Sequence, residues 1–219
     1  MKKTAIVIGA TGLVGSQLVQ QLLGDDRFEK VVIFVRRKSG WANPKLVEHI
    51  VDFNQMDHWK EQIRGDILFS ALGTTLKKAG SKQAQFKIDY TYQYEVAEAA
   101  AQNGVSRYVL ISSAGASPKS KIFYSRMKGE LDEAVQKLSF QKIAILRPSF
   151  LNGDRKEERT GEKVMLKISR WATQFAFKKY RPIKDKTVAK AMIHVALSDD
   201  LSSGKFMYEL DEIFPLAGE

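Results

Sequence analysis

The stretch Thr4-Ala-Ile-Val-Ile-Gly-Ala-Thr-Gly-Leu-Val-Gly15 decides the fold of this chain of 219 residues. A β-branched run ends at Gly9, glycines recur at Gly12 and Gly15, and an apolar helical pattern continues through residue 23. This order predicts a strand, a tight turn and a helix. In such a unit the backbone can approach a pyrophosphate, which then meets the N–H groups of the helix N-terminus. The stretch therefore predicts dinucleotide binding, and a merely tight turn is the alternative.

Apolar runs repeat this alternation along the rest of the chain. Further strands are expected at 31–35, 46–53, 66–70, 107–111, 143–146 and 206–210, and helices at 86–101, 123–138, 162–175 and 187–197. The strand runs are continuously apolar, as is typical of strands covered on both faces. The pattern predicts an α/β protein with a doubly wound parallel sheet and right-handed crossovers.

Length and composition predict one domain, to which residues 151–219 contribute a small lobe for the substrate or a second subunit. Hydrophobic residues make up 44% of the chain, enough for an ordinary core. The apolar start of the chain breaks at Gly9, and no stretch approaches the ~18 apolar residues of a spanning helix. A cytoplasmic location is the default expectation.

The residue inventory excludes several chemistries. Cysteine is absent, which rules out disulfides, thiolate metal sites and an aldehyde dehydrogenase with a Cys nucleophile. The three histidines, His49, His58 and His194, lack the spacing of a zinc helix. No metal is therefore expected.

The net charge of +10 favours anionic partners without choosing among them. Basic residues come in small groups, so a generally solvated surface is the preferred interpretation. Residues 166–181 form a basic amphipathic pattern that could meet a membrane surface or nucleic acid. A helix that covers the cleft or contacts a second subunit is favoured instead. Nucleic acid and membrane are thus not expected as partners, and a homodimer is an open option.

Arg36 and Arg37 stand at the end of the second expected strand, where a site for NAD places an acidic residue on the ribose. Guanidinium groups can pair with a 2′-phosphate, so NADP(H) is favoured over NAD(H), with exposed surface arginines as the alternative. Asp52 and Phe53 could bracket the adenine, and residues 70–73 would pass under the ribose and nicotinamide. The expected cofactor-binding residues are Gly9, Ala10, Thr11, Gly12, Leu13, Val14, Gly15, Arg36, Arg37, Asp52, Phe53, Ala71, Leu72, Gly73, Thr74, Tyr124 and Lys128.

Tyr124 and Lys128 stand one turn apart on the expected helix, downstream of the Ser112-Ser113 pair. An adjoining apolar stripe should pack the helix onto the sheet and leave both side chains along its flank, toward the carboxyl ends of the strands. The stripe consists of Phe123, Met127, Leu131, Ala134 and Leu138.

A phenol can hand its proton to the alkoxide that develops when a carbonyl receives hydride. A phenol ordinarily ionises near pH ~10, and a nearby ammonium favours its ionised form. Lys128 would act in this way on Tyr124 and also hold the nicotinamide ribose, while Ser113 would hold the substrate oxygen. The expected substrate is a small carbonyl compound or alcohol, and Ser112 is expected to support the loop.

The chain resembles the short-chain dehydrogenase/reductase superfamily. The motifs that carry the resemblance are the glycine turn, Ser112-Ser113, Tyr124-x-x-x-Lys128 and Arg147-Pro148-Ser149. It is nearer still to the atypical branch that contains the HIV Tat-interacting protein, through residues 72–75, 78–81, 112–116 and 124–130. The resemblance implies a Rossmann fold, NADPH, a Ser-Tyr-Lys site, and Pro148 and Ser149 as further cofactor residues.

Two departures from the superfamily pattern stand out. Asp89 replaces an Asn that many extended members carry, and it could hold or disturb a water in a proton relay. The portion after Phe150 is short for a nucleotide-sugar epimerase, so a sugar-nucleotide substrate is not expected. The alternative function is an NADPH-binding redox sensor or scaffold protein without turnover.

Overall fold

The computed structural model describes residues 2–152, 178–198 and 203–219. Within them, seven parallel strands form one sheet in the order β3-β2-β1-β4-β5-β6-β9. The strands are β1 (Lys3–Ile8), β2 (Phe28–Val35), β3 (Leu46–Ile50), β4 (Ile67–Ser70), β5 (Arg107–Ile111), β6 (Lys142–Arg147) and β9 (Gly204–Glu209). The predicted doubly wound parallel sheet is confirmed.

The strand order reverses at β1, which pairs with β2 on one side and with β4 on the other. In register, Ile8 lies beside both Phe34 of β2 and Ser70 of β4. Ligands of open α/β sheets bind at such a switch point, outside the carboxyl ends of the strands. The turns after β1 and β4 therefore flank the place where a nucleotide is expected.

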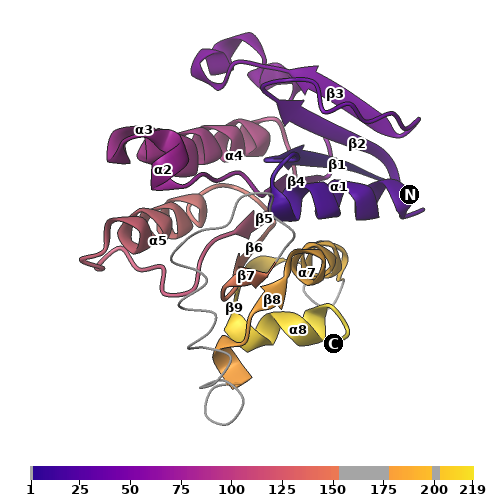
Figure 1. The fold of residues 1–219 in the computed structure, drawn as a ribbon. Helices are drawn as coiled ribbons and strands as arrows, with labels where there is room; N and C mark the ends of the chain where they lie inside the picture. Colours follow the sequence, from indigo (N-terminus) through magenta and orange to yellow (C-terminus); the bar gives the residue numbers. More distant parts are fainter. Residues whose placement is uncertain (1, 153–177, 199–202) are drawn as a thin grey trace.

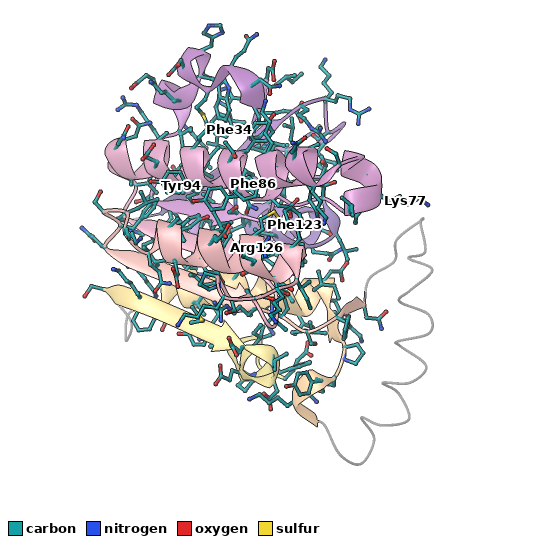
Figure 2. All side chains as sticks on the ribbon, turned by 90° about the vertical axis from the view of Figure 1, so that its left-hand side faces the viewer. Phe34, Lys77, Phe86, Tyr94, Phe123 and Arg126 are labelled. Atoms are coloured by element: carbon teal, nitrogen blue, oxygen red, sulfur yellow. The ribbon has the colours of Figure 1, made fainter. Side chains whose placement is uncertain are left out.

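Helices cover both faces of the sheet (Figure 1). One face is covered by α1 (Leu13–Gly24) and α7 (Asp185–Leu197), and α8 (Ile213–Leu216) packs against α7. The other is covered by α4 (Tyr92–Gln102) and α5 (Phe123–Val135). Figure 2 looks onto this second face, where Phe86 and Tyr94 lie on the helical layer next to Phe123 and Arg126 of α5.

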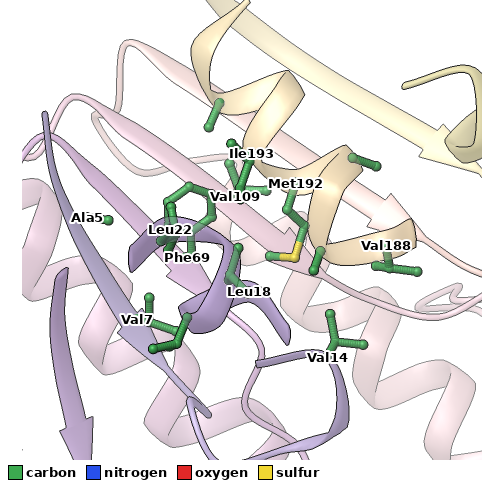
Figure 3. Close-up of a cluster of buried hydrophobic side chains, with 14 of the residues drawn as sticks. Ala5, Val7, Val14, Leu18, Leu22, Phe69, Val109, Val188, Met192 and Ile193 are labelled. Carbon is green, nitrogen blue, oxygen red and sulfur yellow. The ribbon is translucent and has the colours of Figure 1, made fainter. Parts of the chain in front are cut away.

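The core is divided between the two faces of the sheet because successive strand residues point to opposite sides. Figure 3 shows the part between the sheet and the helices α1 and α7, where Leu18, Phe69, Val109 and Met192 meet. Leu131 and Val135 of α5 belong to the cluster on the opposite face. Both clusters are fully buried, which explains the continuous apolar runs.

The remaining elements are short. They are η1 (Phe53–His58), η2 (Lys60–Gln62), α2 (Leu76–Ala79), α3 (Lys82–Phe86), the π-helical turn η3 (Lys87–Thr91), β7 (Leu151–Asn152), η4 (Lys178–Tyr180), β8 (Ile183–Lys184) and η5 (Leu210–Glu212). Strands β7 and β8 pair with each other, apart from the main sheet. The small lobe proposed for residues 151–219 stays a prediction.

Several boundaries differ from the prediction. The strand expected at 46–53 ends at Ile50, because the Asp52 side chain accepts a hydrogen bond from the Asn54 N–H and starts η1. The helix expected at 86–101 is divided into α3, η3 and α4, and α5 ends at Val135 rather than Leu138. The helix expected at 162–175 and most of the basic segment 166–181 lie outside the described residues. In the described part of the chain, no helix has the length and hydropathy needed to cross a bilayer.

Candidate cofactor-binding and catalytic site

The glycine turn after β1 packs directly against the turn after β4. Gly9 has a φ of 75°, and its carbonyl accepts a hydrogen bond from the Gly12 N–H at 2.9 Å. A Cβ at Gly9 would overlap the carbonyl group of Ala71 and the nitrogen of Leu72. Glycine is therefore required at this position, both for the conformation and for the contact.

The turn leads straight into α1, whose N-terminus has no side-chain cap. Thr11 and Gly12 are exposed, whereas Ala10, Val14 and Gly15 are buried. The first turn of a helix leaves backbone N–H groups without intrahelical partners, and the helix dipole adds positive charge there. These residues fit a pyrophosphate.

A buried carboxylate holds the turn after β4. The Ala71 N–H donates to the Ile8 carbonyl at 3.0 Å, which ties the turn to β1. The Thr74 N–H donates to Asp89 Oδ2 at 2.9 Å, and Asp89, in the π-helical turn η3, is 2% exposed. Gln85 Nε2 donates to the Thr74 carbonyl. Sequence reasoning singled out Asp89 as unusual, but not its hold on this turn.

The side chains expected around the adenosine end of the cofactor differ in their exposure to solvent. Arg36 and Arg37 are exposed directly after β2. Asp52 is exposed and lies at a cavity of about 350 Å³ that runs along β3 and η1. Phe53 is 4% exposed and packs against Trp59 and Tyr92, so it is part of the core. A role of Asp52 and Phe53 toward adenine stays a prediction.

Tyr124 and Lys128 both lie on α5, as the spacing predicts, but their environments differ. Tyr124 is 38% exposed in the first turn of the helix. Lys128 is 2% exposed, and its Nζ donates to the carbonyl of Ile111 at 3.4 Å. The sequence places both side chains along the flank of the helix, and the structure buries Lys128 beside Met127 on the face of α5 that packs on the protein. Its ammonium nevertheless reaches the carboxyl end of β5.

The loop that holds Ser113 is fixed between β6 and α5. Ser112 N–H donates to the Leu146 carbonyl at 2.8 Å, and Ala114 N–H donates to the Pro148 carbonyl at 3.1 Å. Ser113 is partly exposed, and its Oγ makes a long hydrogen bond of 3.4 Å to the Ala114 carbonyl. The site therefore joins Ser113, Pro148 and the start of α5 in one framework.

A glycine on α5 completes this framework. The Ser117 N–H donates to the Ser125 carbonyl at 3.0 Å, and a Cβ at Gly129 would overlap the backbone of Ser117 and Pro118. The loop thus lies directly on the helix that carries Tyr124 and Lys128. Ser149, beyond Pro148, donates its hydroxyl to the carbonyl of Arg181.

A buried charged group beneath the site escaped sequence reasoning. Asp132 is fully buried, and its Oδ2 accepts hydrogen bonds from Ser112 Oγ and from Arg147 Nε, each at 2.9 Å. Arg147 Nη1 in turn contacts Glu209 Oε1 at 2.6 Å. Burial raises the pKa of the Asp132 carboxyl, while the Ser112 hydrogen bond and the charges of Lys128 and Arg147 oppose this rise. The sequence signal that could have indicated this buried carboxylate is the spacing of Asp132, one helical turn beyond Lys128.

The described ranges contain no group of three His, Asp or Glu side chains arranged to hold a metal ion. The arrangement instead combines a helix N-terminus suited to a pyrophosphate with a phenol, an ammonium and a hydroxyl at the carboxyl ends of β5 and β6. These groups suit proton and hydride transfer beside a dinucleotide.

Comparisons with known proteins identify the family. A family model described as NAD(P)H-binding matches residues 9–199. The chain belongs to this NAD(P)H-binding family. Among its members, Protein FMP52, mitochondrial, of Candida albicans is 37% identical over 174 residues, which cover 77% of this chain and 76% of the relative. Protein HTATIP2 of Rattus norvegicus is 32% identical over 205 residues, 90% of this chain and 82% of the relative. The resemblance to the HIV Tat-interacting branch is confirmed.

Solved structures place this member of the NAD(P)H-binding family in the short-chain dehydrogenase/reductase fold. A superfamily protein from Agrobacterium tumefaciens with bound NAD superposes with a TM-score of 0.68 at 15% identity, covering 97% of this chain and 81% of that one. The protein thus has an NAD(P)-binding, oxidoreductase-like fold. The expectation of a cytoplasmic location is wrong by these comparisons, because the FMP52 relative is named mitochondrial.

Proposed function

We propose that the protein is an NADPH-dependent oxidoreductase that reduces a small carbonyl compound, or oxidises the corresponding alcohol. The observation that carries the proposal is the position of Tyr124 and Lys128 on α5. The Lys128 ammonium reaches the carboxyl end of β5, and the loop with Ser113 is bonded to both β6 and α5. The glycine turn that would hold the nucleotide opens on the same edge of the sheet.

In this proposal each side chain has a distinct role. The bound cofactor supplies or accepts the hydride. Ser113 donates a hydrogen bond to the substrate oxygen, and Tyr124, being partly exposed, hands its proton to that oxygen as negative charge develops. Lys128 favours the ionised form of Tyr124 after the transfer and holds the nicotinamide ribose. Burial strengthens the electrostatic effect of its ammonium.

The preference for NADP(H) over NAD(H) rests on Arg36 and Arg37. Both are exposed at the end of β2, next to the switch point, where a 2′-phosphate could pair with them. The family description covers both cofactors, and the Agrobacterium relative in fold was solved with NAD. The choice between the cofactors is therefore decided by titration with NADPH and NADH.

A homodimer is part of the same proposal. Phe86, Tyr90 and Tyr94 stack in a partly exposed row along α3, η3 and α4. Figure 2 shows Phe86 and Tyr94 on this layer, beside α5. Such a row of aromatic rings suits a protein contact. Sedimentation of the full chain at several concentrations measures the oligomeric state directly.

The central experiment compares NADPH binding with NADPH consumption. We expect the protein to bind NADPH and to consume it with at least one member of a panel of aldehydes and ketones. Tyr124→Phe should lower kcat by about a hundredfold or more, the size of a general acid contribution, with little change in the Kd for NADPH. Tyr90→Phe, another partly exposed tyrosine on the same face, is the matched control and should leave kcat unchanged.

The same panel separates the enzyme from the alternative, a redox sensor or scaffold protein. Tight NADPH binding with no consumption across the panel would favour the sensor. Full activity in Tyr124→Phe would show that another group donates the proton.

A further inference from the structure

The loop that follows β2 carries three consecutive cations, Arg36, Arg37 and Lys38. It leaves the sheet beside the proposed nucleotide site, because Phe34, near the end of β2, pairs in register with Ile8, the residue before the glycine turn. Among the described residues, neither Arg36 nor Arg37 forms an ion pair or a side-chain hydrogen bond. Both guanidinium groups are therefore available to an anion.

Few contacts hold this loop in place. Within the described part of the chain, residues 36–42 make no backbone–backbone hydrogen bond. Gly40 has a φ of 78° and open space where a Cβ would lie, and Trp41 is 39% exposed. A loop with so few hydrogen bonds of its own opens easily unless a side chain of another element fixes it.

Glu48 of β3 provides such a side chain. Its Oε2 accepts a hydrogen bond from the Ser39 N–H at 2.8 Å, and the Ser39 Oγ accepts one from the Trp41 N–H at 3.2 Å. Strand β3 is itself fixed against β2 up to the start of the loop, because the Val51 N–H donates to the Val35 carbonyl at 2.8 Å. Among the hydrogen bonds of the described residues, the one to Glu48 alone ties this loop to another element.

The carboxylate of Glu48 has two opposite effects on an anion at this loop. Hydrogen bonding with Ser39 and the charge of Lys38 hold the pKa of the Glu48 carboxyl below its ordinary value of 4.5. The group is therefore ionised near neutral pH, where its charge repels a phosphate while its hydrogen bond fixes the cations that attract one. Substitution separates the two effects, since glutamine keeps a hydrogen-bond acceptor and loses the charge.

We propose that Glu48 is a positioning residue for cofactor selectivity: through Ser39 it holds the loop after β2 in the conformation that presents Arg36 and Arg37 to the 2′-phosphate of NADPH. The loop is then ordered before the cofactor arrives, so less conformational entropy is lost on binding. NADH lacks the 2′-phosphate and gains nothing from this order. The importance of Glu48 for selectivity rests on the proposed NADPH preference, whereas its hold on the loop does not.

The hold on the loop is measured in the full chain without cofactor, as hydrogen exchange of the Ser39 amide followed by NMR. In Glu48→Ala this amide should exchange at least about tenfold faster than in the wild type, because it loses its acceptor. In Glu48→Gln the rate should stay within about threefold of the wild type, because the amide oxygen still accepts. The matched control is Glu29→Ala, which removes an exposed carboxylate at the other end of β2. It should leave the exchange of Ser39 unchanged.

Selectivity is measured as the ratio of the Kd for NADH to the Kd for NADPH, by fluorescence titration. Glu48→Ala should lower this ratio about threefold to tenfold, the loss expected when one flexible side chain must be ordered on binding. The whole change should lie in the Kd for NADPH. Glu48→Gln should keep the ratio at or above that of the wild type, because it removes a negative charge near the phosphate. A general defect in folding would weaken both cofactors alike and leave the ratio unchanged.

Three results would overturn the proposal. Unchanged exchange of Ser39 in Glu48→Ala would show that the hydrogen bond does not hold the loop. Faster exchange with an unchanged ratio would remove the link between the loop and selectivity. An equal fall of the ratio in Glu48→Gln and Glu48→Ala would assign the effect to the charge of Glu48 instead of its hydrogen bond.

The titration of the wild type tells a failure of the proposed function from a failure of this inference. If the wild type binds NADH as tightly as NADPH, the NADPH preference is refuted, and the selectivity role of Glu48 with it. The exchange of Ser39 still decides in that case whether Glu48 holds the loop.

Discussion

The buried carboxylate of Asp89 accepts a hydrogen bond from the backbone N–H of Thr74, with 2.9 Å between Oδ2 and the nitrogen. This bond crosses from the π-helical turn η3 to the turn that follows β4. The turn after β4 in turn supports the glycine turn after β1, through the contact between Ala71 and Gly9. Asp89 therefore supports the glycine turn, the proposed nucleotide site, through the backbone of the turn after β4.

Removal of this carboxylate should loosen the turn after β4. We expect Asp89→Ala to lower the free energy of unfolding by about 1.5–3 kcal/mol, the usual cost of losing a hydrogen bond to a charged group, and to weaken NADPH binding. Asp89→Asn should be milder, because its amide oxygen can still accept from Thr74. Urea denaturation and fluorescence titration with NADPH measure the two effects. Gln83→Ala, an exposed position on α3, is the control. Unchanged NADPH affinity in Asp89→Ala would contradict the role in the site.

The glycine turn offers a sharper test of the contact between the two turns. Gly9→Ala places a Cβ on the Ala71 carbonyl at a φ of 75°, so we expect a loss of about 3 kcal/mol or more in unfolding free energy and loss of NADPH binding. Gly40→Ala is the matched control. Gly40 has a similar φ of 78°, and no described atom lies within 4 Å of the point that an alanine Cβ would occupy, so the cost should be about 1 kcal/mol. Equal losses in the two variants would show that the turns do not depend on this contact.

The fold was predictable because its signals are local. Strand β5 was predicted with its observed bounds, since an apolar run between turn signals needs no distant contact to be recognised. The break in the helix at η3 was not predicted. A π-helical turn has no strong sequence signature, and the contact that this one makes, from the Thr74 N–H to Asp89, joins residues 15 positions apart.

The positions of the candidate site residues in the fold were predictable where their spacing sufficed, and not where they depended on distant partners. The spacing of Tyr124 and Lys128 placed them on one helix. The burial of Lys128 follows from tertiary packing, and buried Asp132 pairs with Arg147, which in turn meets Glu209 from 62 residues away. Charged residues on a helix predict a solvent-exposed face unless the partner that neutralises them is known.

The contact of α5 with the loop of Ser113 predicts an unusual effect of a helix-favouring substitution. Alanine raises helix propensity by about 1 kcal/mol over glycine, yet at Gly129 its Cβ would overlap Ser117 and Pro118. We expect Gly129→Ala to lower the unfolding free energy by about 1–3 kcal/mol and to reduce kcat, because the loop must move. The control is Gly24→Ala at the end of α1, where no described atom lies within 4 Å. It should be neutral or stabilising. A stabilised Gly129→Ala with full activity would contradict the packing argument.

The cofactor preference is tested by removing both guanidinium groups after β2. We expect Arg36→Ser with Arg37→Ser to raise the Kd for NADPH about tenfold to a hundredfold, as each charge-assisted hydrogen bond contributes about 1.5–3 kcal/mol. The Kd for NADH should change little, since it lacks the 2′-phosphate. Lys38→Ser, at the next exposed position, is the control. Equal weakening of both cofactors, or tighter NADH binding by the wild type, would remove the basis for an NADPH preference.

Stability at acid pH should report the ion pair at the end of α1. Asp25 contacts Arg27, with Oδ2 and Nη2 2.6 Å apart, and the side-chain hydrogen bond from Arg27 lowers the pKa of Asp25 below its ordinary value of 3.8. The folded state thus holds the carboxylate more firmly than the unfolded chain does. This stabilisation is present above about pH 3.8 and is lost as the pH falls through the lower, folded pKa. Because the Arg27 side chain is 62% exposed, we expect Asp25→Asn to lower the free energy of unfolding by only about 0.2–1 kcal/mol at pH 7.

Urea denaturation at pH 7 and near pH 2.5 measures the difference in unfolding free energy between the wild type and Asp25→Asn, which should shrink at the lower pH. Asp26→Asn, whose side chain is 98% exposed, should have no measurable effect at either pH. A difference for Asp25→Asn that grows toward acid pH would show that the carboxylate is not stabilised in the folded state.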